Sequence, residues 1–343
     1  MQIRSTRRSF ALLLCGLLGG AGSCSSQAAD PPAAAPTTVE AAAKLLNLAE
    51  FPLPNGAESP QRRYLAGLSY KTPGTVKSVF EFQRKQLADK KWKELPGGYA
   101  SDDSTNGAFS RDGYTLSIAV SSTGQPGSVS VTIQNHGNVR LDKLPVPAEA
   151  KPLFVGPAIA MYVADLPADQ ATDACRKLLL ADGWQTYGKA GDAEFFKRNA
   201  VKLTAFIRAA PAQGGKTAIN YSTVLMSVDL PAPADAIEVR YADVTATLSF
   251  DSEAPTAAVV DYYKTTLGKA DWNATTEKPF DDGFKKMMIF RNPAKDMLTL
   301  EMADVDGKTR VLLKHQSAAE IEEIERLIRE EAAAKKKAKE EGK

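Results

Sequence analysis

The sequence predicts an α+β protein, made of three tandem β-α-β-β-β repeats followed by a charged C-terminal helix. The first observation behind this prediction is that the three tryptophans, Trp92, Trp184 and Trp272, each lie five residues after a leucine at the end of a helix-like segment. The second is that a phenylalanine precedes a leucine–hydroxyl pair by 7, 7 and 8 residues in the same three places. Self-similarity at a nearly fixed spacing is the signature of repeated structural units.

Residues 1–23 have the pattern of an export signal peptide. Arg4, Arg7 and Arg8 precede an apolar run over 10–18, and small residues follow. The run is shorter than the roughly 20 apolar residues that span a bilayer as a helix. The adjacent pair Arg7-Arg8 resembles the twin-arginine (Tat) export signal, and the alternative is an ordinary secretory signal that happens to contain two arginines.

Two processing sites compete after this segment. Residues 21–24 resemble a bacterial lipoprotein cleavage box that ends in Cys24, although Ala21 stands where a leucine is usual. The rival is the small-x-small pattern that ends at Ala28, a site for ordinary cleavage. We favour lipidation of Cys24, which makes the lipid the expected membrane anchor. Cys175 is then the one free cysteine of the mature chain, so we expect no intramolecular disulfide.

Residues 24–57 are interpreted as an Ala/Pro-rich tether and a short helix. The spacing of Thr37 and Glu40 matches a capping box, and an apolar face continues from Val39 to Ala49. The repeat domains are predicted over 58–146, 152–231 and 235–316, with short proline-containing linkers between them. Each domain is expected to be an antiparallel sheet of about four strands with one helix on a face.

Residues 317–343 form the predicted C-terminal helix. A capping box at Ser317 opens it, and a narrow apolar stripe follows, made of Ile321, Ile324, Leu327 and Ile328. A helix this short is marginal in water unless something buries its apolar side. We expect this stripe to pack on the third domain, with docking into a partner protein as the alternative. It is the candidate partner-binding surface of the sequence.

The candidates for chemistry are few. Trp92, Trp184 and Trp272 are interpreted as core anchors of the repeats, with a ligand-lining role as the alternative. His136 and His315 lack neighbouring ligands, so no metal site is expected. The acidic pair at 281–282, together with Glu277, and the equivalent pair at 102–103 are interpreted as solvated loops. No catalytic residue and no cofactor is predicted.

Basic residues recur near one strand end of every repeat. They are Arg111, Arg198 and Arg291, each one or two residues after a phenylalanine. An exposed arginine that covers apolar surface is the expected role, and anion binding is the alternative.

The charge balance argues against nucleic-acid binding. Removal of residues 1–23 leaves 40 basic and 41 acidic residues, so there is no basic field to attract a polyanion. We expect a non-enzymatic exported envelope or periplasmic protein that acts as a binding or scaffold module. Its partner would be an envelope protein or a small apolar ligand, and its contact with the membrane would be through the lipid only.

Two alternatives remain open at this point. One is a secreted enzyme of unknown reaction with a site between domains, which would show as clustered acids or histidines in a cleft. The other is a purely structural spacer without a pocket or an exposed apolar patch. The layout, a tether followed by small α+β domains, resembles that of lipoproteins of envelope complexes, but no motif is shared.

Overall fold

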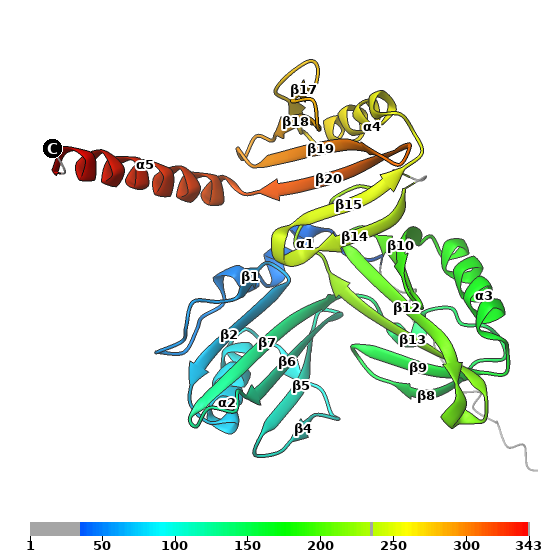
Figure 1. The fold of residues 1–343 in the computed structure, drawn as a ribbon. Coiled ribbons are helices and arrows are strands. Elements are labelled where there is room, and N and C mark those ends of the chain that lie inside the picture. The colour runs from blue at the N-terminus through cyan, green and yellow to red at the C-terminus, as the bar shows by residue number, and fades with distance from the viewer. Residues whose placement is uncertain (1–34, 234–235, 342–343) are drawn as a thin grey trace, which may run out of the picture. The chain divides into compact units, whose positions relative to one another are not determined.

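The computed structural model describes residues 35–233 and 236–341, so the predicted signal segment and Cys24 lie outside the described residues. The described chain contains five α-helices and three antiparallel sheets, which agrees with the predicted α+β class (Figure 1). No helix in this part of the chain is long and apolar enough to cross a membrane. The helices are α1 (Val39–Leu45), α2 (Val76–Asp89), α3 (Ala168–Ala181), α4 (Thr256–Gly268) and α5 (Ala318–Glu341).

The first sheet has the strand order β1-β2-β7-β6-β5-β3, and the short strand β4 also pairs with β5. Helix α2 packs on it through buried apolar side chains such as Phe80 and Leu87. Gln83 lies on the same buried face and donates a hydrogen bond to the Tyr70 hydroxyl. The strands are β1 (Arg62–Tyr64), β2 (Gly67–Pro73), β3 (Lys93–Glu94), β4 (Tyr99–Ala100), β5 (Ser104–Arg111), β6 (Tyr114–Ser122) and β7 (Ser128–Gly137).

The second and third sheets follow the same strand order. The order of the second sheet is read here from β8. In all three sheets a hairpin comes first, followed by the strand that is last in the chain and then by the two strands before it. The strand that directly follows the helix comes at the end. Each has its own cluster of buried apolar side chains. The strands of the second are β8 (Lys151–Val155), β9 (Ile159–Ala164), β10 (Gln185–Ala190), β11 (Ala193–Arg198), β12 (Val201–Ala210) and β13 (Lys216–Leu225). Those of the third are β14 (Ile237–Ala242), β15 (Thr247–Ser252), β16 (Asn273–Ala274), β17 (Phe280–Asp281), β18 (Lys286–Arg291), β19 (Met297–Val305) and β20 (Lys308–Gln316).

The sheets are larger than the four strands expected from the sequence, because they contain 7, 6 and 7 strands. The predicted pattern lacks the first strand of each hairpin and the short strands after the helix. Those of two or three residues, such as β1, β3 and β16, are too short to show apolar alternation, which is the signal of a half-buried strand. Strands β8, β10 and β14 have five or six residues and were missed although their length allows the pattern.

The alternation of Val244, Ala246, Leu248 and Phe250 with polar residues predicts a strand that begins at Val244. This start is wrong, because Asp243–Thr245 form a 3-10 turn and Ala246 has a positive φ of 46°.

The repeated spacing from leucine to tryptophan is explained by the way the three helices end. The backbone N–H of Trp92, Trp184 and Trp272 donates to the carbonyl of the leucine five residues earlier, at 3.0 Å in each case. The residue just before each tryptophan has a positive φ: Lys91 at 65°, Gly183 at 87° and Asp271 at 60°. A left-handed residue followed by this long-range bond is the Schellman C-cap. The spacing therefore marks the stop signal of each helix.

The three indoles differ in burial. Trp92 and Trp184 are buried in the cores of the first and second sheets. Trp272 is only half-buried and packs on the edge of the third core, where its ring lies 5.9 Å from that of His315 in an edge-to-face arrangement.

The N-terminal helix differs in detail from its prediction. Its N-cap is Thr38, whose side chain accepts from the backbone N–H of Ala41 at 3.2 Å, whereas the predicted cap was Thr37. Thr37 instead hydrogen-bonds the Tyr114 hydroxyl and is buried against the first sheet. The helix also ends earlier than expected, at Leu45, and a 3-10 turn follows over Leu48–Glu50.

The C-terminal helix confirms its predicted cap, because Ser317 and Glu320 hydrogen-bond each other in both directions. The expected packing of its apolar stripe on the third domain is wrong. Ile321 is half-buried, but Ile324, Leu327 and Ile328 are 42%, 51% and 60% exposed. Figure 1 shows the reason, since α5 continues away from the end of β20 without folding back on its sheet.

The burial of the indoles predicts unequal costs of truncation. Trp92→Ala and Trp184→Ala should each lower the free energy of unfolding by about 3–5 kcal/mol, as buried aromatic truncations do. Trp272→Ala should cost roughly half as much or less, because part of its surface is already in water. Urea unfolding of the three variants measures these costs. Equal losses at all three positions would contradict the difference in burial.

Candidate functional site

A groove beside α2 has a volume of about 1190 Å³. It lies between α2, from its N-terminus to Arg84, and the segment 94–102, which contains the end of β3, the residues that link β3 to β4, and β4 itself. We call it the α2 groove. Its lining includes Val76 and Phe80 from the helix, Tyr99 from β4, and Thr105 and Asn106 from β5.

The α2 groove exists because β3 and β4 both pair with β5, but the residues between them do not. Strand β3 pairs with the far half of β5 and β4 with its near half, and Leu95–Gly98 bridge the gap. Gly98 must be glycine for this path, since a Cβ there would lie 2.8 Å from the carbonyl oxygen of Asn106. Gly107 likewise makes room for the Phe80 ring, whose Cζ would be 2.8 Å from an added Cβ. Small residues therefore shape both walls.

The floor of the groove is apolar, and its rim carries charges and an exposed ring. Val76 and Phe80 are buried at the base, whereas Tyr99 is 57% exposed at the rim. Arg84 forms ion pairs with Glu81 at 2.7 Å and with Glu94 at 3.5 Å along one side. An apolar base with a polar rim is the usual composition of a binding site.

The other two sheets have smaller hollows at the equivalent place. The hollow beside α3 has a volume of about 290 Å³, and the one beside α4 about 380 Å³. We call the segment 94–102 of the first sheet, and the equivalent segment between β16 and β18 of the third sheet, the arms of these sheets. The arm of the third sheet carries two exposed rings, Phe280 and Phe284, of which Phe284 is 92% exposed. In the second sheet β10 and β11 pair with each other directly, so there is no arm to widen the hollow.

The equivalent edge of the second sheet is occupied by the chain itself. Strand β10 lies against β14 of the third sheet. At the contact, a Cβ added to Gly188 would lie 2.5 Å from the carbonyl oxygen of Val239. Gly188 also has a positive φ of 103°, so this close approach depends on glycine. The second sheet thus uses internally an edge that the first and third sheets leave open.

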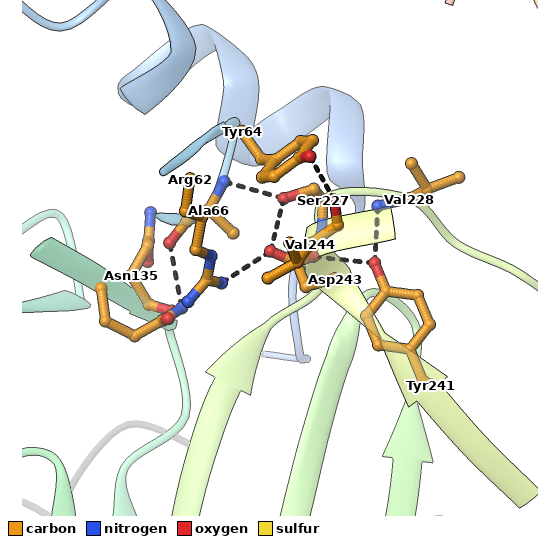
Figure 2. Close-up of polar contacts among 10 residues, drawn as sticks. Arg62, Tyr64, Ala66, Asn135, Ser227, Val228, Tyr241, Asp243 and Val244 are labelled. Atoms are coloured by element: carbon orange, nitrogen blue, oxygen red, sulfur yellow. Dashed lines mark hydrogen bonds and ion pairs between the residues drawn. The ribbon is translucent and has the colours of Figure 1, made fainter. Parts of the chain in front are cut away.

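A second cluster of functional-group side chains lies where the three sheets meet (Figure 2). The Asp243 carboxylate accepts from Arg62 Nη2 at 2.6 Å and from the Tyr241 hydroxyl at 2.8 Å. It also accepts from the backbone N–H of Ser227 at 2.8 Å and from its hydroxyl at 3.1 Å. The Ser227 hydroxyl oxygen in turn accepts from the backbone N–H of Ala66 at 3.1 Å. We call this cluster the Asp243 junction.

The Asp243 junction has the character of a structural link. Its side chains come from β1, the segment after β13, β14 and the 3-10 turn that follows β14. Burial, reinforced by the neighbouring Asp243 charge, raises the pKa of the Tyr241 hydroxyl, so that group stays protonated and donates. Tyr64 adds a further bond by donating to the Val244 carbonyl. Each of these hydroxyls already has a protein partner, which leaves the carboxylate engaged rather than presented to a substrate.

The residues singled out from the sequence are dispersed rather than gathered into one site. Trp92, Trp184 and Trp272 lie at three separate helix ends, and Ile321, Ile324, Leu327 and Ile328 lie on α5. Asp281 and Asp282 accept backbone N–H groups of the turn that follows them. These bonds lower the pKa of the Asp282 carboxyl. Within the described ranges, no group of three potential metal ligands comes together.

The recurring arginines have a clear structural role in two of the three places. Arg111 donates to the carbonyl of Lys90 at 2.9 Å, and Arg198 donates to that of Asp182. These carbonyls belong to the C-caps of α2 and α3, where a positive charge is favourable. Arg198 also lies over the Trp184 ring, with 5.0 Å between its guanidinium carbon and the ring centroid. Arg291 instead donates to the carbonyl of Lys295 at 3.0 Å.

Sequence reasoning missed the α2 groove and the Asp243 junction. The glycine pair at 97–98 was the available signal for the groove. These residues lie in the segment that links β3 to β4, and the second sheet has no such segment. The junction had no comparable local signal, since Arg62 and Asp243 are 181 residues apart.

His136 predicts how stability depends on pH. Its Nδ1 donates to the Thr223 carbonyl at 2.6 Å, and its Nε2 then accepts from the Ser117 hydroxyl at 2.8 Å, so it joins β7 to β13 in the neutral form. Burial lowers its pKa. As the pH falls below about 6.5, the unfolded chain takes up a proton that the folded chain resists, so stability should fall.

Urea unfolding between about pH 7.5 and 5.5 measures this loss, and His136→Gln should reduce it. His315→Gln is the matched control, because burial also lowers the pKa of His315 but Asp296 opposes the shift. Its effect should be the smaller of the two. A pH dependence that His136→Gln leaves intact would contradict this assignment.

No protein-family model, curated protein or solved structure matches the chain.

Proposed function

We propose that the chain is a non-enzymatic exported protein of the cell envelope, anchored as a lipoprotein through Cys24. In this proposal its three sheets are copies of one repeated unit that together form a binding scaffold. The shared strand order supports the repeat. So do the three matching helix caps, which end on Trp92, Trp184 and Trp272. The N-terminal pattern of the sequence supports export and lipidation.

The α2 groove is the observation that carries the binding function. Its volume of about 1190 Å³ exceeds the range of about 300–1,000 Å³ that is typical of small-molecule pockets. It is also bordered by β3 and β4, which end the strand order of the first sheet. The proposed ligand is therefore an extended peptide segment of another envelope protein rather than a small apolar molecule.

The features of the groove suggest how such a segment would bind. A peptide laid along β4 would add a strand to the sheet edge, which is a common mode of peptide recognition. An apolar side chain of the peptide would reach Phe80 at the base, and Tyr99 would cover it from the rim. The Arg84 ion pairs would face polar groups of the peptide, so the site favours a segment with alternating apolar and polar residues.

A displayed library of random peptides, selected on the chain without its signal segment, tests this function. Binding of a selected peptide, measured by calorimetry, should weaken about 5–30-fold in Tyr99→Ala, as loss of a rim aromatic typically does. Phe280→Ala is the matched control at the equivalent position of the third sheet, and it should leave the affinity unchanged. Failure to select any peptide that responds to Tyr99→Ala would remove the α2 groove as the binding site.

The membrane anchor has its own test. Cys24→Ser should move the protein from the membrane fraction to the soluble fraction, because the proposed lipid is the anchor that remains after the signal is cleaved. Fractionation of cells that express the two forms measures the shift, with Cys175→Ser as a control that keeps Cys24. Unchanged membrane retention in Cys24→Ser would rule out lipid anchoring at this residue.

A further inference from the structure

Asparagine is followed by glycine at two places in the chain, Asn55-Gly56 and Asn106-Gly107. Asparagine is one of the chemically labile residues of proteins. A glycine after it has no side chain to obstruct its own backbone nitrogen, which can then approach the side-chain amide carbon of the asparagine. The local chemistry of the two pairs is the same, so a difference between them in the folded protein must come from the structure.

Asn55 and Gly56 occupy the middle of an exposed turn. The backbone N–H of Ala57 donates to the carbonyl of Pro54 at 3.2 Å, which closes the turn. Gly56 has a positive φ of 80°, a conformation that favours glycine at the third position of a turn. Both central residues are exposed to solvent. A single hydrogen bond at the surface is a weak restraint, so this turn can open locally at low cost in free energy.

Asn106 and Gly107 lie in the middle of a sheet. Asn106 is opposite Tyr99 of β4 and Ala119 of β6, and Gly107 is opposite Ile118 of β6. The side-chain oxygen of Asn106 also accepts from the backbone N–H of Tyr99 at 3.2 Å. Rotation of the backbone at this point would separate β5 from both neighbouring strands. Opening of this kind costs more free energy than opening of a single turn.

We propose that Asn55 is a site of spontaneous deamidation in the folded protein, whereas Asn106 is protected by its sheet. The backbone nitrogen of Gly56 forms a bond to Cγ of Asn55, and the bond from Cγ to Nδ2 breaks. The amide proton of Gly56 passes through solvent to the leaving nitrogen, which departs as ammonia. The product is a cyclic succinimide. Water then adds to either carbonyl of the ring and opens it to aspartate or isoaspartate.

The surroundings of the turn allow the ring to close without wider unfolding. Phe51 is buried on one side of the turn, and on the other side the N–H of Glu58 donates to the carbonyl of Lys71 at 2.9 Å. The piece of chain that has to move lies between these two anchors. A Cβ added to Gly56 would be in ordinary contact with Pro73, at 3.5 Å, so the turn is not tightly packed against β2.

The modification would change the surface next to the α2 groove. Pro73, beside the turn, ends β2, and Thr75 after it lines the groove. Both products replace a neutral amide with a carboxylate that is ionised at neutral pH, so they make the chain more acidic. Isoaspartate also lengthens the main chain by a methylene group, which would break the bond between Ala57 and Pro54. The change is irreversible and accumulates with the age of the molecule.

Peptide mass spectrometry of the full mature chain, incubated for weeks at mildly alkaline pH, tests the proposal. Cleavage after lysine and arginine places Asn55 in the peptide 45–62 and Asn106 in the peptide 94–111. Deamidation of Asn55 should be about tenfold faster or more than that of Asn106, since a turn opens more readily than a strand ladder. Water enriched in a heavy oxygen isotope should label the new carboxyl group.

Asn47 is an internal control in the same peptide as Asn55. The side chain of Leu48 obstructs the backbone nitrogen after it, and Asn47 is also held by hydrogen bonds to Ala49 at 3.1 Å and Glu50 at 2.8 Å. Asn47 should therefore stay unmodified. Asn55→Gln should remove the modification from the peptide 45–62, and circular dichroism checks that this variant is folded.

Unfolding in urea separates the effect of structure from that of sequence. Both pairs are followed by alanine, so they should react at similar rates in the unfolded chain. Folding should slow Asn106 strongly and Asn55 little. Equal rates at the two positions in the folded chain overturn the proposal. So does a reaction of Asn55 that folding slows as much as that of Asn106, or a modification that persists in the peptide 45–62 of Asn55→Gln.

Discussion

Segments of all three sheets converge on the Asp243 carboxylate. A carboxylate with 13% of its side-chain surface exposed is costly to bury unless hydrogen bonds replace its water. Asp243 receives four of them, from Arg62, Ser227 and Tyr241. Removal of any one donor leaves a partly buried charge with fewer partners, so the bonds depend on one another. The junction is therefore a point at which a local change would be felt in every sheet.

The sequence is informative where a structure is determined by neighbouring residues. The spacing from Leu87 to Trp92 and its two counterparts identified the ends of three helices, because a Schellman cap is complete within six residues. The apolar stripe of α5 was found in the same way, from helical periodicity. Its exposure was not predictable, since burial depends on where the rest of the chain lies.

Long-range structure was beyond the reach of the same reasoning. Arg62, in the three-residue strand β1, gave no periodic signal, although it binds Asp243 on a distant segment. Asp243 itself lies in a 3-10 turn at the start of a run that alternates like a strand, so the sequence pattern did not reveal the turn. The α2 groove is similar in kind. Its two walls come from a helix and from a bridging segment whose course depends on the close approaches at Gly98 and Gly107.

The shared strand order gives each sheet the same two edges, but the edges have different uses. The second sheet places β10 against β14, and Gly188 allows the backbones to come close. The first and third sheets instead carry arms at that edge, with Tyr99 and Phe280 exposed at matching positions. The same strand order thus supplies an internal contact in one sheet and edges with exposed rings in the other two.

The helix caps have a consequence for the order in which the structure opens. Only Gly183 adopts the left-handed conformation at little cost, whereas Lys91 and Asp271 hold a side chain in it, at a cost of about 1 kcal/mol. The last turns of α2 and α4 should therefore fray before that of α3, and their amide protons should exchange with solvent sooner.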